Sequence, residues 1–174
     1  MNQVDLHMDL ETGSLRENAA IFSIGAVAVK GHEIIDRFHI RIDPHCYENR
    51  HRIFDNYPWW LENNIEEYNL IEEEGIPLGQ ALHLFNEWLS RWPMEQVKYW
   101  QKRWWDILWL ESAYFACSME CPVRYSAVRE LVTHIEAIGG NPSYKNDNLH
   151  NALADAEAQA MAWITAELNH VCKN

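Results

Sequence analysis

The residues best suited to chemistry in this sequence are acidic, and two of them lie close together near the N-terminus. Asp9 and Glu11 are separated by one residue in a segment where apolar and polar residues alternate. On a β-strand such residues leave the same face about 7 Å apart, so two anions would converge. Under a covering layer this arrangement needs a compensating cation, such as a metal ion. A strand whose polar face meets water is the alternative, and it is favoured for the pair taken alone.

A histidine and a further aspartate occur together near the C-terminus. His150 and Asp155 are five residues apart, which is a rotation of about 140° on an α-helix, so they cannot share one helix face. They can converge if His150 lies on the loop that enters the helix, with Asn148 or Asn151 as the N-cap. For Asp155 alone, attraction to the positive end of the helix dipole would be a sufficient explanation.

Another carboxylate, Asp106, follows a stretch rich in basic and aromatic side chains. Residues 96–105 contain no acidic residue, and their basic and aromatic members are Lys98, Tyr99, Trp100, Lys102, Arg103, Trp104 and Trp105. This combination suits a surface that binds a nucleic-acid backbone and stacks on bases. Tryptophans that pack in the core are the simpler interpretation, and a single aspartate at a helix start is more often an N-cap than a metal ligand.

The strands that would position these residues are indicated by hydrophobic periodicity. Residues 4–11 alternate between apolar and polar, residues 21–29 form an almost continuous apolar run, and residues 37–42 alternate again. Three early strands are therefore expected, the second of them covered on both faces. A turn is expected at residues 30–32, between the second and third strands.

Helical spacing of apolar residues follows in the rest of the chain. Helices are expected at residues 78–92, 107–117, 128–138 and from 151 to the C-terminus, with a short strand at 96–100. Three meandering strands followed by mixed helices and strands indicate an α/β fold. The length of 174 residues predicts a single domain over residues 1–174.

Composition restricts the classes of function. The longest nearly apolar run spans residues 19–29, too short for the roughly 20 residues of a membrane-spanning helix, so no membrane partner is expected. The N-terminus has neither a basic nor an apolar signal region, which predicts a cytoplasmic protein. The net charge of −12 argues against binding of long duplexes, although six glutamates in residues 62–74 contribute half of it.

Taken as a set, the acidic residues and the histidine resemble the signature of the DEDDh 3′-5′ exonucleases of the ribonuclease H-like superfamily. Residues 9–13 match the acidic core of the first motif, Asp-x-Glu-Thr-x-Gly, with Gly13 one place early. Residues 150–155 match the third motif, His-x-Ala-x-x-Asp, in full. The resemblance spans nearly the whole chain and implies a central mixed β-sheet flanked by helices, with three early antiparallel strands and later parallel ones.

The second motif departs from the family pattern. Relatives usually have Trp-Gly-Asn-Gly-x-x-Phe-Asp, whereas residues 100–106 read Trp-Gln-Lys-Arg-Trp-Trp-Asp, one residue shorter and without the small turn. Asp106 remains the natural ligand, and Trp105 can replace the phenylalanine. The sequence is most similar to the small phage-type branch, in which a tryptophan pair, here Trp59 and Trp60, precedes the middle helix.

The resemblance implies a site for two divalent metal ions, Mg²⁺ or Mn²⁺. In the family pattern Asp9 would bridge both ions, and Glu11 and Asp155 would complete the site that activates water. Asp106 would hold the second ion, and His150 would be the general base. Carboxylates suit these hard cations, and an unperturbed imidazole titrates close to neutral pH.

The implied substrate is a single-stranded 3′ end, shortened to 5′-mononucleotides, with DNA slightly favoured over RNA. Metals and stacking would then hold the strand without a basic surface. The expected contacts are Thr12 and Gly13 by resemblance, and Trp59, Trp60, Lys102 and Arg103 by composition and position. For the two adjacent tryptophans, packing in the core is at least as compatible with the sequence.

Two other classes of function stay open at this point. The altered second motif is compatible with a catalytically weak nucleic-acid-binding or interaction module of the same fold. An acidic structural domain is the least specific alternative. Homodimers are common among relatives, but nothing in the sequence establishes one here.

Overall fold

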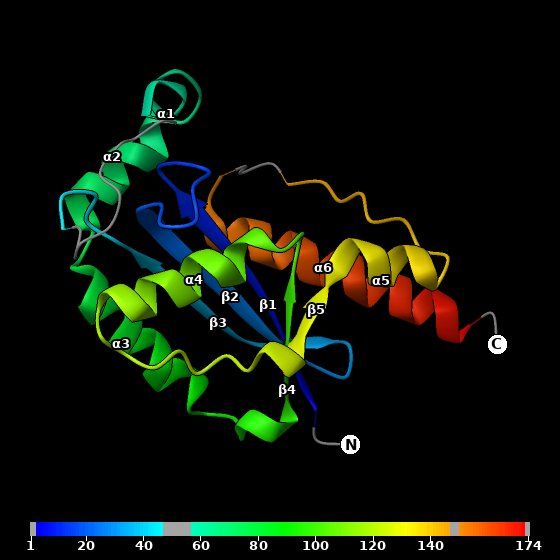
Figure 1. The fold of residues 1–174 in the computed structure, drawn as a ribbon. Coiled ribbons are helices and arrows are strands. Elements are labelled where there is room, and N and C mark those ends of the chain that lie inside the picture. The colour runs from blue at the N-terminus through cyan, green and yellow to red at the C-terminus, as the bar shows by residue number, and fades with distance from the viewer. Residues whose placement is uncertain (1–2, 47–56, 147–149, 173–174) are drawn as a thin grey trace.

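A five-stranded mixed sheet is the centre of the protein. The computed structural model describes residues 3–46, 57–146 and 150–172, and the strands lie in the order β3-β2-β1-β4-β5 (Figure 1). The strands are β1 (Val4–Thr12), β2 (Ile21–Lys30), β3 (Glu33–Arg41), β4 (Val97–Gln101) and β5 (Val128–Glu130). The first three pair antiparallel, whereas β4 runs parallel to β1 and β5 parallel to β4. The predicted α/β class and mixed sheet are confirmed.

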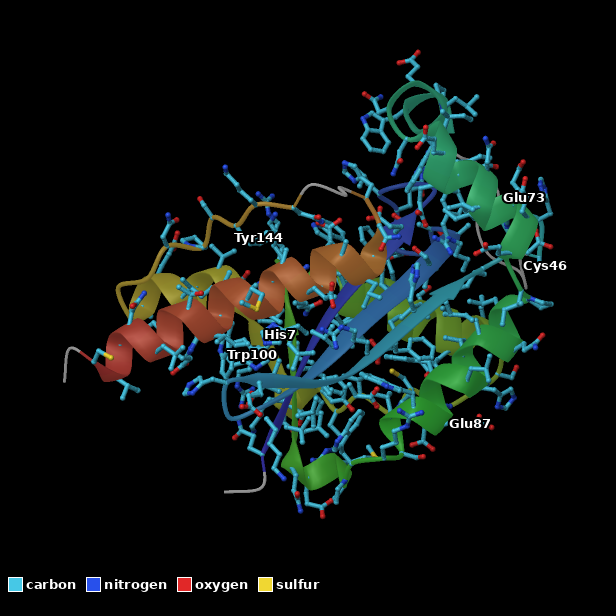
Figure 2. The ribbon with its side chains drawn as sticks, turned by 180° about the vertical axis from the view of Figure 1, so that it is seen from behind. His7, Cys46, Glu73, Glu87, Trp100 and Tyr144 are labelled. Carbon is cyan, nitrogen blue, oxygen red and sulfur yellow. The ribbon has the colours of Figure 1, made fainter. Side chains whose placement is uncertain are left out.

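Helices cover both faces of this sheet. They are α1 (Tyr57–Asn63), α2 (Ile65–Glu74), α3 (Leu78–Leu89), α4 (Trp105–Ala116), α5 (Leu131–Ala137) and α6 (Ala152–Val171). Apolar residues of α3 and α4 pack with β1 and β2 in one core, and those of α5 and α6 pack in a second core against the opposite face. Figure 1 shows α4 in front of the sheet, and Figure 2, from behind, shows α6 crossing it. No described helix is long and apolar enough to span a membrane.

The polar face of β1 is covered by α6, so the solvent-exposed alternative for Asp9 and Glu11 is wrong. Glu11 is buried and Asp9 is partly buried. His7, on the same face, packs against the rings of Trp100 and Trp163 and is fully buried, which lowers its pKa to about 3 (Figure 2). Water cannot solvate polar residues beneath a covering helix. Such residues therefore need hydrogen-bond or ion partners inside the protein.

Most predicted elements are confirmed, and two differences have physical causes. The predicted helix at residues 128–138 is wrong at its start, because Val128 lies in β5. The Glu130 side chain then accepts hydrogen bonds from the backbone N–H groups of Val132 and Thr133 and begins α5 there. Helices α1 and α2 were not predicted. Their stability comes from tertiary packing of residues such as Trp60 and Tyr68, not from a strong apolar period.

A glycine in the apolar run of β2 brings α6 into contact with the sheet. Gly25 pairs with Asp9 in the β1–β2 ladder. A Cβ atom at Gly25 would lie 2.1 Å from the carbonyl carbon of Ala152 and 2.2 Å from the amide nitrogen of Leu153. Because those are backbone atoms, they cannot move aside as a flexible side chain could. Because Gly25 has no side chain, the first turn of α6 can lie directly beside Asp9.

We expect Gly25→Ala to displace the first turn of α6 and to lower the free energy of unfolding by about 3 kcal/mol, at the upper end of overpacking effects. Gly31→Ala is the matched control, because a Cβ there meets nothing within 4 Å and only its positive φ of 64° opposes the change. Its expected loss is about 1 kcal/mol. Urea unfolding of both variants measures the difference, and equal losses would contradict the steric argument.

Candidate functional site

Three carboxylates converge where the C-terminal end of β1 meets the N-terminal end of α6. Asp9 and Glu11 come from β1, and Asp155 lies in the first turn of α6. One ligand oxygen from each lies within 4.8 Å of the others. The strand parity of β1 and the close approach of α6 at Gly25 produce this cluster from residues that are far apart in sequence.

A fourth carboxylate, Asp106, approaches the same point from α4. Its Oδ1 atom accepts a hydrogen bond of 3.2 Å from the backbone N–H of Leu10, the residue between the two acids of β1. Asp106 is not the N-cap, which is Trp104, but the second residue of the helix. Its position in the first turn of α4 also places it near the positive end of that helix dipole.

The electrostatics of this cluster oppose full ionisation. Desolvation, and then repulsion by Asp106 and Glu11, raises the pKa of Asp9 well above its usual value. Desolvation, followed by repulsion from Asp155, does the same for the pKa of Glu11. Burial raises the pKa of Asp106 to about 7. The charge of Lys102 opposes the shifts at Asp9 and Asp106 without cancelling them. Hard oxygen donors with uncompensated negative charge are what a divalent cation such as Mg²⁺ or Mn²⁺ requires.

His150 precedes α6 and faces the cluster, as the spacing argument requires. Its backbone adopts φ of 63°, and its N–H donates a 2.9 Å hydrogen bond to Oδ2 of Asp155. The imidazole Nδ1 lies 4.0 Å from Oε2 of Glu11, and the ring packs edge-on against Trp59 with centroids 4.6 Å apart. The side chain remains 43% exposed. A solvent-accessible imidazole therefore stands beside the carboxylates.

The loop of His150 is held by α2 and β3. Asn64 donates from Nδ2 to the carbonyl oxygen of His150 at 3.3 Å. Asn151 caps α6 by accepting from the N–H of Ala154, and its Nδ2 donates to Oε2 of Glu67 at 3.1 Å. Arg41 binds the same Glu67 carboxylate through two hydrogen bonds, of 2.9 and 3.2 Å. This network fixes the unusual backbone conformation at His150 from both sides. The expected N-cap at Asn151 is confirmed, whereas Asn148 lies outside the described residues.

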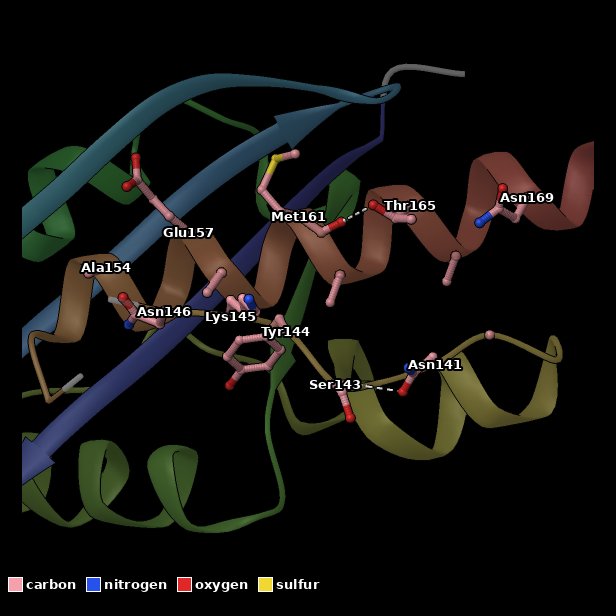
Figure 3. A pocket seen from close by; sticks show the side chains of 14 residues that line it. Asn141, Ser143, Tyr144, Lys145, Asn146, Ala154, Glu157, Met161, Thr165 and Asn169 are labelled. Carbon is pink, nitrogen blue, oxygen red and sulfur yellow. Dashed lines mark hydrogen bonds between the residues drawn. The ribbon is translucent and has the colours of Figure 1, made fainter. Parts of the chain in front are cut away.

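Two amide side chains donate hydrogen bonds to carboxylates of the cluster. Gln159, one turn after Asp155 on α6, is fully buried and donates from Nε2 to Oδ1 of Asp9 at 2.8 Å. Asn146 donates from Nδ2 to Oδ1 of Asp155 at 3.0 Å and lies beside the first turns of α6 (Figure 3). Amides supply hydrogen bonds without positive charge, so they restrict the carboxylates and do not compete with a cation.

An aromatic pocket of about 400 Å³ adjoins the carboxylates on the side of His150. Its lining residues are Leu10, Glu11, Thr12, Leu15, Trp59, Trp60, Trp109 and His150. Trp59 is 38% exposed, whereas Trp60 is 1% exposed. Trp60 packs against Phe22, and its Nε1 donates to the carbonyl oxygen of Thr12. This geometry favours packing for Trp60 and leaves Trp59 open to a ligand. Gly13 is buried and donates its N–H to the carbonyl oxygen of Ala20.

The predicted basic contacts lie in the loop between β4 and α4. Lys102 and Arg103 are both exposed. The ammonium group of Lys102 lies 5.1 Å from the ring centroid of Tyr144, a residue of the segment before α6 (Figures 2 and 3). Repulsion by Asp9, Asp155 and Asp106 adds to burial in raising the pKa of Tyr144, so this ring borders the carboxylate cluster. Between its segment and α6 lies a second pocket of about 560 Å³ (Figure 3).

Several positioning residues were not recognised in the sequence analysis. A glycine inside an apolar strand is a signal of close backbone approach, and Gly25 could have been found in this way. The roles of Gln159, Asn146 and Glu67 depend on contacts between distant elements, for which a single sequence contains no signal.

The arrangement was compared with known families. The 3′-5′ exoribonuclease Rv2179c-like domain family matches residues 4–166, which is nearly the whole chain. The chain belongs to this family. The predicted membership among the 3′-5′ exonucleases of the ribonuclease H-like superfamily is therefore confirmed. A comparison with curated protein sequences found no significant match.

Solved structures of exonuclease I share the fold of this Rv2179c-like domain. A zinc-bound complex of the Escherichia coli enzyme with single-stranded DNA has a TM-score of 0.69 and 14% identity, covering 99% of this chain and 43% of that one. A product-bound exonuclease I has a TM-score of 0.65 and 15% identity, covering 100% of this chain and 44% of that one. The enzyme from Methylocaldum szegediense has a TM-score of 0.63 and 11% identity, covering 95% and 40%. The chain thus spans less than half the length of these proteins.

Asp106→Asn is expected to stabilise the metal-free protein. A carboxylate whose folded-state pKa is raised favours the folded state at low pH, and that contribution is lost as pH rises through about 7 for Asp106. The amide keeps an acceptor for the Leu10 N–H but removes the charge. At pH 8 in chelator we expect a gain on the order of 2 kcal/mol in unfolding free energy, shrinking toward pH 5. Added Mn²⁺ should stabilise the wild type more than the variant, which keeps only the cluster of Asp9, Glu11 and Asp155.

Denaturant unfolding with and without Mn²⁺ measures both effects. Glu111→Gln, on the exposed face of the same helix, is the matched control for removal of one negative charge. It should change neither the pH dependence nor the response to metal. A variant Asp106→Asn that is less stable than the wild type in chelator at pH 8 would contradict the repulsion argument.

Gln159→Leu is expected to weaken metal binding about tenfold, the lower end of the effect of losing an outer hydrogen bond to a ligand. Leucine removes Oε1 of Gln159, which no donor reaches among the described residues, but it also leaves Oδ1 of Asp9 without this hydrogen bond. We therefore expect the fold to be retained with a loss of about 1 to 3 kcal/mol in unfolding free energy. Titration calorimetry with Mn²⁺ gives the affinity, and Gln80→Leu on the exposed side of α3 is the control. Unchanged affinity in Gln159→Leu would show that Asp9 is oriented without it.

Proposed function

We propose that this protein is a metal-dependent 3′-5′ exonuclease that shortens single-stranded nucleic acid to 5′-mononucleotides. The observation that carries the proposal is the convergence of Asp9, Glu11 and Asp155, whose ligand oxygens lie within 4.8 Å of one another. Asp106 accepts a hydrogen bond from the backbone of the same strand, β1. The raised pKa values of Asp9, Glu11 and Asp106, with no buried Lys or Arg beside them among the described residues, favour a divalent cation at this cluster. Family membership supplies the reaction class, and the site supplies the groups for it.

Asp9, Glu11, Asp155 and Asp106 would hold two divalent ions, Mg²⁺ or Mn²⁺. Such ions activate a water molecule and neutralise the charge that develops on the leaving oxygen. His150 would accept the proton of the attacking water. The exposed imidazole allows this proton to leave to solvent, and hydrogen bonds of the His150 backbone with Asn64 and Asp155 hold this residue at the rim of the cluster.

The terminal nucleotide would occupy the aromatic pocket of about 400 Å³. Thr12 lines its floor, and Trp59 offers an exposed face against which a base can stack. Lys102 would neutralise a phosphate near the metals, and Arg103 a phosphate farther along the strand. The solved relatives include complexes with single-stranded DNA, and the family is named for action on RNA. We therefore propose DNA or RNA 3′ ends as substrates.

One observation favours a second candidate, a binding module with little catalysis. Residues 101–103, Gln-Lys-Arg, stand where the family has its small turn, and Arg103 has φ of 66°. A displaced Asp106 would weaken the second metal position while leaving a nucleic-acid surface intact. The two candidates differ in whether a bound strand is shortened.

His150→Gln tests the exonuclease directly. Loss of a general base is expected to lower kcat by a factor of about 10² to 10⁴. Mn²⁺ binding should stay within about twofold of the wild type, because the imidazole is not among the proposed ligands. The assay follows 5′-labelled single-stranded DNA and RNA oligomers of one sequence with Mg²⁺, Mn²⁺ or chelator. His83→Gln, at an exposed position of α3, is the control. Binding without shortening by the wild type would favour the module instead.

A further inference from the structure

Two tryptophans at the start of α4, the N-cap Trp104 and the first helical residue Trp105, are exposed. Tyr99 and Trp100 are buried in the two cores, as the packing interpretation predicts. Trp104 and Trp105 are 58% and 49% exposed, so packing does not account for them. They directly precede Asp106 in the chain, and Trp109, one helical turn after Trp105, lines the aromatic pocket beside the candidate metal site.

The ring of Trp105 extends the aromatic wall of the nucleotide pocket outward. It stacks on Trp109, with ring centroids 5.9 Å apart and an interplanar angle of 24°. Trp109 is buried and lines the pocket, and its Nε1 donates to the carbonyl oxygen of Arg16 at 2.7 Å. A rigid inner ring thus supports an exposed outer ring, so the stacking surface continues beyond the space for one nucleotide.

The charge of this loop selects an anionic partner. Lys102 and Arg103 are exposed in a chain whose net charge is −12, and they precede the two tryptophans directly. The loop has a defined conformation, because Arg103 adopts φ of 66° and its N–H donates to Oε1 of Glu130 at 2.9 Å. Cations next to exposed aromatic faces suit a polymer with phosphates and unpaired bases, which is single-stranded nucleic acid.

We propose that Trp104 and Trp105 form a stacking platform for the bases on the 5′ side of the terminal nucleotide, with Lys102 and Arg103 on the adjacent phosphates. The inference rests on the proposed exonuclease function and defines its substrate as a 3′ tail with more than one unpaired nucleotide. Bases within a duplex present no free face, so a paired 3′ end would bind poorly. In the family pattern Trp105 takes the place of the phenylalanine, and Lys102 and Arg103 lie where relatives have the small turn.

The test combines variants of the platform with loss of the bases. KM and kcat are measured with Mn²⁺ for a single-stranded oligomer and for one that is abasic at the two positions 5′ of the terminal nucleotide. For the wild type we expect the abasic oligomer to raise KM about tenfold with little change in kcat. The Trp104→Ala/Trp105→Ala variant should show the raised KM with normal bases and no further increase with the abasic oligomer. Trp105→Phe should recover part of the affinity.

Phe115→Ala is the matched control, because this aromatic residue of α4 is 84% exposed and lies away from the loop. It should keep the wild-type response to both oligomers. Equal KM values for the wild type on both oligomers, with normal shortening, would overturn the platform and leave the exonuclease function intact. If the wild type shortens no oligomer, the proposed function fails, and fluorescence anisotropy with the same two oligomers decides whether the platform binds bases.

Light scattering tests for a second copy of the chain as the occupant of this surface. Under our proposal the platform variant and the wild type have the same molar mass. A dimer that becomes monomeric in Trp104→Ala/Trp105→Ala, with unchanged KM for the oligomer, would overturn the proposal and assign the tryptophans to an interface between copies.

Discussion

The repulsion among carboxylates at the end of β1 is the constraint on which the rest of the site depends. Like charges held a few ångströms apart under a covering helix destabilise the folded state unless protons or cations neutralise them. The structure lessens this repulsion in several ways without removing it. Asp106 and Asp155 each lie in the first turn of a helix, where the dipole favours an anion. Hydrogen bonds from Gln159, Asn146 and backbone N–H groups reach oxygens of Asp9, Asp106 and Asp155.

Close packing keeps the repelling groups together. Gly25 allows the backbone of α6 to lie against β2, and the apolar cores on both faces resist any expansion that would separate the acids. The N-terminal turn of α6 is fastened again by the Arg41, Glu67 and Asn151 network. Favourable packing thereby offsets the unfavourable repulsion among the acids. Such local strain, stabilised by the surrounding fold, is common at functional sites.

Basic residues near the candidate site are separate from the most acidic part of the surface. The glutamates of α2 and the overall charge of −12 oppose non-specific binding along a nucleic acid. Lys102, Arg103 and the aromatic side chains are gathered beside the carboxylates instead. Under the proposed function a strand would be bound at its end, where metals and stacking would act together, and not along its length. This agrees with an exonuclease that takes single-stranded ends.

The sequence by itself indicated the first strand, the family and the acidic centre. The evidence was the alternation at residues 4–11, the aspartate and glutamate two residues apart, and the histidine five residues before Asp155. These features are local, because strand parity and helix spacing follow from neighbouring residues. Tertiary structure alone decided that α6 covers the polar face of β1, that Trp60 packs while Trp104 and Trp105 remain exposed, and that Gln159 reaches Asp9. Those outcomes depend on which distant elements pack together, and residue type and spacing within one segment do not determine that.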